Sequence, residues 1–379
     1  MRHARSPMVA LAISSILVAA AVVISFQLGS TRLSYNRPPL LCAANGMALS
    51  GSDLWVSGCV FRTRSEFSAR IPAIVELDIK TGSLIRVIKD PRAGNDGPVG
   101  IAVSGGRVWV ANGDGNSILE LSAATGMKIR LITSMSDELN SPWNIAASRS
   151  DVWIFNGGSF TITELNANDG SLVRVIVAHA DELAGVDSIS LSGSRLWLTN
   201  GTYADNSVVE LNTKSGSLVR ILNATSDSFN EPAGVAFEGS KVWVTSNEGP
   251  IAKTPQADAA PNLPGGSVTV LNATSGSVIR VIKARADHFY GPSGMVVSGR
   301  RVWVANGMDD VVTELRTSNG SLVRLIDAKQ DGLQGPSEIV VKGQRVWILD
   351  SAVSLGNDVW GGAITELNAK HGTLVRVIR

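Results

Sequence analysis

Seven tryptophans stand in one recurring context along this chain of 379 residues, and their spacing strongly constrains the fold. Each is the centre of an apolar-Trp-apolar triplet, as in Val108-Trp109-Val110. The seven are Trp55, Trp109, Trp153, Trp197, Trp243, Trp303 and Trp347. Successive separations are 54, 44, 44, 46, 60 and 44 residues. A period in the forties of strand-rich sequence is typical of the blades of a β-propeller.

A second marker, centred on a glycine, also occurs seven times. It reads TGSLIRVI at Thr81–Ile88, DGSLVRVI at Asp169–Ile176, SGSLVRIL at Ser215–Leu222 and HGTLVRVI at His371–Ile378. Variants of the same theme surround Gly126, Gly276 and Gly320. Because two independent markers agree in number, we expect an all-β fold, a seven-bladed β-propeller.

One repeat shows the layout expected for every blade. Four short β-rich segments, at Val99–Val103, Arg107–Asn112, Ser117–Ser122 and Met127–Ile132, are separated by turn residues. This order predicts four-stranded antiparallel blades. The first blade opens near Asn45 and the last closes at Ile378, so the two chain ends share no blade. We therefore expect packing between blades to close the ring.

The N-terminus differs in kind from the repeats. Arg2, His3 and Arg5 precede an apolar run from Val9 to Phe26. A positive stretch before an apolar segment fits a cleaved signal peptide or an uncleaved membrane anchor. Both readings place the remaining chain outside the cytoplasm, secreted, periplasmic or anchored. We expect residues 1–30 to be the signal or anchor, 31–43 a linker and 44–379 the propeller.

The chain has two cysteines, Cys42 and Cys59, on either side of a predicted hairpin turn at Ser50–Asp53. In an oxidising compartment, such a pair is a disulfide candidate. The formal net charge is +1 without long runs of one sign. This pattern gives no basic face for nucleic acid. We expect membrane contact only through the N-terminal segment, and a monomer.

A recurring charge pair has a structural explanation. In six repeats an arginine follows a glutamate by ten residues, as Arg86 follows Glu76. Across a hairpin centred on the glycine turn, this spacing places the two side chains opposite each other. Because the pair recurs around the ring, we expect it to support the fold. The alternation within each triplet likewise places the tryptophans in the core between blades.

The segment GPVGIAVSGGRVWVANGDGNSILELSAATG, at residues 97–126, resembles repeats of the YVTN/NHL-type, YncE-like propeller family. The resemblance extends over residues 44–379. It implies a propeller fold. That family includes binding proteins, scaffolds and a few enzymes, so the resemblance does not select one function.

Variation between repeats indicates where a site would lie. Long insertions follow the second strand in three repeats, which makes one face of the ring variable, and loops on a rigid scaffold often carry function. Candidate binding residues at the channel mouth are Asn112, Trp143, Asn144, Asn156, Asp187, Asn200, Asn306, Glu338, Asp350 and Trp360. The alternative is that these Asn and Asp residues simply close turns.

Two classes of function remain open. The first is a binding or scaffold module for a protein, a glycan or another envelope ligand, without catalytic residues or a cofactor. The second is a metal-dependent propeller enzyme. The streptogramin-lyase type implies histidines with a divalent metal, and no matching histidine set stands out. The lactonase type implies a channel calcium, for which Asn112, Asn156, Asn200, Asn306, Glu338 and Asp350 could supply oxygen ligands.

Overall fold

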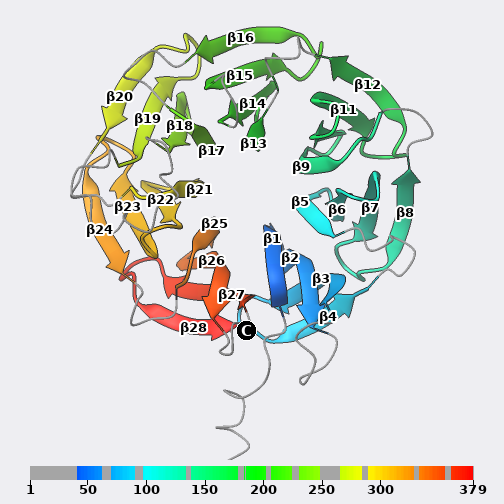
Figure 1. Cartoon of the computed structure of the whole chain (residues 1–379), viewed down its shortest axis with the longest axis horizontal. Coiled ribbons are helices and arrows are strands. Elements are labelled where there is room, and N and C mark those ends of the chain that lie inside the picture. The colour runs from blue at the N-terminus through cyan, green and yellow to red at the C-terminus, as the bar shows by residue number, and fades with distance from the viewer. Residues whose placement is uncertain are drawn as a thin grey trace, which may run out of the picture.

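The computed structural model describes residues 41–378, except 62–69, 90–96, 134–137, 178–182, 184, 202–205, 224–229, 248–264, 284–288, 328–332 and 355–359. Twenty-eight strands form seven sheets, and each sheet contains four consecutive antiparallel strands. The sheets stand around a central channel as the blades of a propeller (Figure 1). The predicted all-β, seven-bladed fold is therefore confirmed.

The blades are numbered one to seven along the chain. In each blade the four strands follow one another from the channel outward in chain order. The innermost strands are β1 (Leu41–Ser50), β5 (Pro98–Ser104), β9 (Pro142–Ala147), β13 (Val186–Ser192), β17 (Pro232–Glu238), β21 (Pro292–Ser298) and β25 (Pro336–Lys342). The second strands are β2 (Asp53–Phe61), β6 (Arg107–Asn112), β10 (Asp151–Asn156), β14 (Arg195–Asn200), β18 (Lys241–Ser246), β22 (Arg301–Asn306) and β26 (Arg345–Ser354). The third strands are β3 (Arg70–Asp78), β7 (Ser117–Ser122), β11 (Thr161–Asn166), β15 (Ser207–Asn212), β19 (Ser267–Asn272), β23 (Val311–Arg316) and β27 (Trp360–Asn368). The outer strands are β4 (Leu84–Ile88), β8 (Lys128–Thr133), β12 (Leu172–Val177), β16 (Leu218–Asn223), β20 (Val278–Ile282), β24 (Leu322–Asp327) and β28 (Leu374–Ile378).

A row of paired residues crosses each blade from the channel to the rim. In blade two it reads Ala102, Trp109, Glu120 and Arg130, each the direct cross-strand partner of the next. Direct partners lie on the same face of a sheet. The seven tryptophans of these rows are 0–1% exposed, and each packs against residues of the following blade. The prediction that they form the core between blades is confirmed.

The Glu–Arg pairs connect blades as well as strands. In blade three, Arg174 Nε lies 2.6 Å from Glu164 Oε2, and Arg174 Nη2 donates a hydrogen bond to Lys214 O at 3.1 Å. Lys214 belongs to the turn between the third and outer strands of blade four. The same bridge occurs in four other blades, where the carbonyls belong to Lys80, Asn168, Thr274 and Lys370. The sequence predicted the pair within a blade, but its contact with the next blade appears only in the structure.

The glycine of each such turn makes room for this arginine. Gly216 has a φ of +71°, and a Cβ there would lie 2.8 Å from Arg174 Cδ. Gly239, in a turn between the first and second strands, has a φ of +56° with open space around it.

We expect Gly239→Ala to lower the free energy of unfolding by about 1 kcal/mol through the left-handed backbone alone. Gly216→Ala should lower it by about 2 kcal/mol, because Arg174 must also leave its two acceptors. Urea unfolding of both variants measures the difference. Equal losses would mean that the Arg174 bridge adds nothing.

Blades seven and one meet at a seam that no strand crosses. β1 packs against β25, β26 and β27, and the C-terminal end of β28 lies beside blade one in Figure 1. One apolar cluster joins Met47 and Val56 of blade one to Trp347 and Ile364 of blade seven. Arg376 Nη2 donates a hydrogen bond to Lys80 O across the seam at 2.8 Å. The expectation that packing between blades closes the ring is therefore confirmed.

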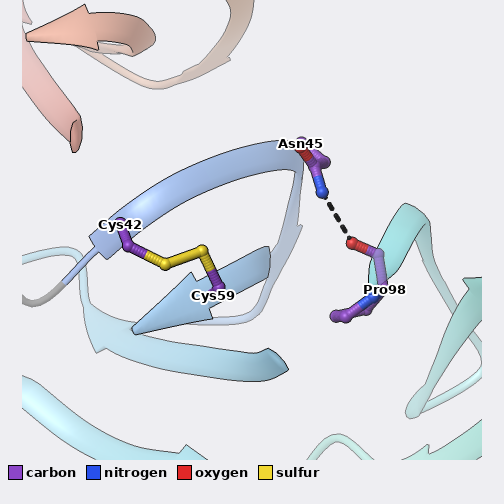
Figure 2. Close-up of a disulfide and its surroundings, with 4 residues drawn as sticks. All are labelled: Cys42, Asn45, Cys59 and Pro98. Carbon is purple, nitrogen blue, oxygen red and sulfur yellow. Dashed lines mark hydrogen bonds between the residues drawn. A yellow bond between two sulfur atoms is a disulfide. The ribbon is translucent and has the colours of Figure 1, made fainter. Parts of the chain in front are cut away.

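Blade one begins slightly earlier than the repeat indicated. β1 starts at Leu41, so residues 41–43 are strand rather than linker. The extra length carries Cys42, which forms a disulfide with Cys59 of β2 across a Cα–Cα distance of 5.3 Å (Figure 2). The disulfide ties the innermost strand of blade one to the second strand of the same blade. Its prediction from the cysteine pair is supported.

The predicted signal or anchor segment, residues 1–30, lies outside the described residues. In the part of the chain that is described, no helix is long and apolar enough to cross a membrane.

Candidate functional site

The innermost strands enclose a cavity of about 890 Å³ at the channel mouth. The mouth is the end where these strands begin and where the second strands connect to the third. In all seven blades the pairing of the innermost strand with the second strand is interrupted at the mouth by a bulge. Bulges redirect side chains and are common beside functional sites. Residues at and just after these bulges, such as Trp143 and Asp187, line the cavity.

Three rings of residues succeed one another down the channel. The upper ring consists of one residue per blade that the pairing skips at the mouth, namely Asn45, Val99, Trp143, Asp187, Ala233, Ser293 and Ser337. The middle ring follows directly in sequence and consists of Gly46, Gly100, Asn144, Ser188, Gly234, Gly294 and Glu338. The lower ring is apolar and consists of Met47, Ile101, Ile145, Ile189, Val235, Met295 and Ile339. All of these residues except Gly46 line the cavity.

Glycine prevails in the middle ring because neighbouring innermost strands approach closely there. A Cβ at Gly234 would lie 2.3 Å from Ser293 O, and one at Gly294 would lie 2.3 Å from Ser337 O. Larger side chains at this position must therefore interact with the next blade. Asn144 does so by donating from Nδ2 to Asp187 O at 3.0 Å.

Glu338 is the charged residue of the middle ring, and it stands at the seam. Its Oε2 accepts a hydrogen bond from Met47 N at 2.6 Å, across the boundary between blades seven and one. Burial raises the pKa of the Glu338 carboxyl from 4.5 to about 7, against the opposing effect of the Met47 hydrogen bond. A group with such a pKa in a cavity is a candidate for function as well as for fold support.

The raised pKa of Glu338 predicts a pH-dependent cost to stability. Because the folded-state pKa lies above the unfolded value, the folded state holds its proton more tightly. The free energy of unfolding therefore contains a contribution that is present below pH 4.5 and is lost as the pH rises through about 7. Glu338→Gln keeps an acceptor for Met47 N without the charge.

We expect Glu338→Gln to match the wild type at pH 4.5 and to be more stable than it at pH 8. Other titrating groups are common to both proteins and cancel in the difference. Urea midpoints at the two pH values measure it. A difference that is the same at both pH values would show that Glu338 titrates normally.

Five predicted site residues lie inside their own blades rather than along the cavity. Asn112, Asn156, Asn200 and Asn306 end their second strands, Asp350 occupies the equivalent position within the longer β26, and all five are at most 2% exposed. Their side chains bond the facing third strand. Asn156 Nδ2, for example, donates to Thr163 Oγ1 at 2.9 Å, and Asp350 Oδ2 accepts from Thr365 Oγ1 at 2.6 Å. This placement favours the turn-closing interpretation.

The residues suggested for a channel calcium are not brought together. Five of the six belong to separate blades and are buried there, and only Glu338 lines the cavity. Among the described residues, no three His, Cys, Asp or Glu side chains form a group that could hold a metal ion. The described chain thus presents one carboxylate of the suggested set to the channel.

The remaining predicted residues have distinct positions. Trp143, with 52% of its surface exposed, and Asp187 and Asn144 all line the cavity together with Glu338. A Cβ at Gly201 would lie 2.8 Å from Asp187 Oδ2. Trp360 is the first residue of β27, and its side chain lies outside the described part of the structure.

Sequence reasoning missed the lower apolar ring and most of the upper ring. Both could have been found by aligning the innermost strands of the seven repeats. Asp114, from the connection between β6 and β7, also lines the cavity. It has no repeat signal, so only the structure reveals it.

Comparisons with known proteins extend the fold assignment. No protein-family model matches this chain, and no curated protein matches it. Among solved structures, hydrazine synthase of Kuenenia stuttgartiensis has a TM-score of 0.64 at 15% identity, covering 86% of this chain and 96% of that chain. A catalytically inactive histidine-to-alanine variant of virginiamycin B lyase from Staphylococcus aureus, with quinupristin, has a TM-score of 0.60 at 16% identity, covering 81% and 91%. A streptogramin B lyase has a TM-score of 0.62 at 15% identity, covering 86% and 94%. At these identities the likeness concerns the fold alone.

Proposed function

We propose that this protein is a binding propeller whose channel mouth holds a ligand, and that it acts outside the cytoplasm. The observation that carries the proposal is the cavity of about 890 Å³. Its walls combine an apolar ring with a few polar groups, the composition typical of ligand sites, and its size falls within the usual range for them. The ligand is a component of the cell envelope, such as a protein segment or a glycan.

Repetition around the ring distinguishes residues that support the fold from residues that could bind a ligand. The Trp–Glu–Arg rows recur around the propeller and hold the blades together, whereas Trp143, Asp187 and Glu338 each occur once. A carboxyl group that burial disfavours in its charged form weakens the fold at neutral pH. Functional residues often lower the stability of the fold, and the Glu338 carboxyl fits that pattern.

Two features support the location and the family. The disulfide between Cys42 and Cys59 suits an oxidising compartment, and the positively charged, apolar N-terminus suits export. The sequence pattern of the repeats suits the YVTN/NHL-type family, to which we propose that the chain belongs.

An enzyme on the same scaffold is the second candidate. Glu338, with its pKa near neutrality, could serve as a general acid or base, and proteins of similar fold include lyases. In the described part of the chain the single histidine is His371, in a turn at the end of the ring opposite the mouth. A lyase-like metal site would therefore need residues beyond those described.

The test compares ligand binding in the full chain with a variant whose mouth is filled, Ala233→Trp. Lys214→Trp, which adds the same ring to an exposed turn at the other end, is the control. Envelope extracts and a small-molecule collection are screened by thermal unfolding after chelation, then with millimolar calcium.

Stabilisation of the wild type and of Lys214→Trp, but not of Ala233→Trp, would support a channel ligand. Stabilisation by calcium alone, with ester or lactone hydrolysis, would favour the enzyme. Ligands that stabilise all three proteins equally would rule out the channel as the binding site.

A further inference from the structure

We propose that the ligand of the channel is an organic cation, with an ammonium or guanidinium group attached to an apolar body. This inference rests on the proposed function of the channel as a binding site. It adds the charge and the shape of what is bound.

The charges of the cavity carry the first step. Among the described residues that line it, Asp114, Asp187 and Glu338 are acidic, and none is lysine, arginine or histidine. Net charge on the whole chain is +1, so this imbalance is local. Low-dielectric walls lined by one sign of charge concentrate counter-ions of the opposite sign.

Glu338 provides the anchoring group. One of its oxygens, Oε2, is held by Met47 N–H at 2.6 Å, which fixes the carboxylate in place. Glu338 also lines the cavity, so a ligand there meets a carboxylate that is already held in place. A cation would replace solvent there with a charge-assisted hydrogen bond.

Trp143 supplies a second interaction from across the channel. Its strand, β9, lies on the side of the ring opposite β25, which carries Glu338 (Figure 1). With 52% of its surface exposed, Trp143 departs from the seven tryptophans of the core. An exposed indole face attracts cations through its quadrupole, and Trp is the most effective residue for this interaction.

The lower ring sets the shape of the ligand. Below Glu338, isoleucine, valine and methionine side chains line the channel in every blade. A small hydrated metal ion would gain nothing from such walls, because metal ions prefer oxygen ligands. An aliphatic or aromatic body would bury apolar surface there, at about 25 cal/mol per Å². Together the rings select a cation with an apolar portion.

The experiment uses three probes that share one skeleton, namely 3-phenylpropylamine, 3-phenylpropanol and 3-phenylpropionate. Binding to the full chain is measured by titration calorimetry and saturation-transfer NMR at pH 8. We expect the amine to bind at least about tenfold more tightly than the alcohol, the carboxylate to bind least, and the amine to weaken as salt increases.

Three variants locate the interaction. Glu338→Gln, which keeps the acceptor for Met47 N, should weaken the amine about tenfold and leave the alcohol unchanged. Trp143→Leu should weaken the amine about threefold. Glu238→Gln is the control, because it removes an acidic residue from the far end of an innermost strand.

Equal binding of all three probes, lost on Ala233→Trp, would overturn the cation inference while leaving the channel as a binding site. Amine binding that Glu238→Gln weakens as much as Glu338→Gln would also overturn it. If none of the probes binds at millimolar concentration, the inference fails, and the separate screen with Ala233→Trp decides whether the proposed function fails with it.

Discussion

Trp347→Ala should cost about 3–5 kcal/mol of unfolding free energy and should also loosen the ring locally. Trp347 is 1% exposed and packs in the apolar cluster between blades seven and one. No strand is shared across this seam, so the chain gives it no covalent support. We expect faster amide exchange in β1–β4 and β25–β28, because opening the seam leaves the other six interfaces intact.

Trp197→Ala is the matched control. Trp197 is also 1% exposed, but it packs at an interface whose two blades follow each other in the chain. The loss of stability should be similar, while increased exchange should not concentrate at the seam. Hydrogen-exchange mass spectrometry with urea unfolding distinguishes the two variants. The same exchange pattern in both would show that the seam is as firmly held as a chain-connected interface.

Removing the disulfide by Cys42→Ala and Cys59→Ala should lower the free energy of unfolding by about 3 kcal/mol. The bond closes a loop with a sequence separation of 17 residues, and its main contribution is to restrict the unfolded chain. It also ties β1 to β2, beside the point where Asn45 Nδ2 donates to Pro98 O of blade two at 2.9 Å (Figure 2). Urea unfolding of the double variant measures the loss.

Reduced wild-type protein provides the comparison for the double variant, since it lacks the bond but retains both side chains. The two should unfold at similar urea concentrations, below that of the oxidised protein. An oxidised protein that unfolds at the same urea concentration as its reduced form would contradict a stabilising role for this disulfide.

Repetition made the architecture readable from sequence alone. Trp109 with its flanking valines, the turn around Gly126 and the ten-residue interval from Glu120 to Arg130 each recur at blade spacing. These patterns reflect pairing between strands that are close in the sequence. The alternation of side chains along a strand and the register of a hairpin are both fixed by nearby residues. The number of blades, the order of strands and the absence of strand exchange between the chain ends all follow from them.

The residues of the candidate site were partly predictable. Trp143, Asn144, Asp187 and Glu338 depart from their repeat equivalents, and all four line the cavity. Asn112 and its counterparts were predicted at the same mouth but are buried, because a residue at the end of a second strand turns toward the third strand of its own blade. A repeat position alone does not reveal that direction.

The sequence by itself thus determined the propeller, the pairing within each blade and the face on which variation gathers. Only the tertiary structure decided which side chains meet between blades. It joined Arg174 to the Lys214 carbonyl, Glu338 to the Met47 amide and three rings of residues into one cavity. The physical reason is distance along the chain. Glu338 and Met47 are 291 residues apart, and closure of the whole ring is what brings them within a hydrogen bond of each other.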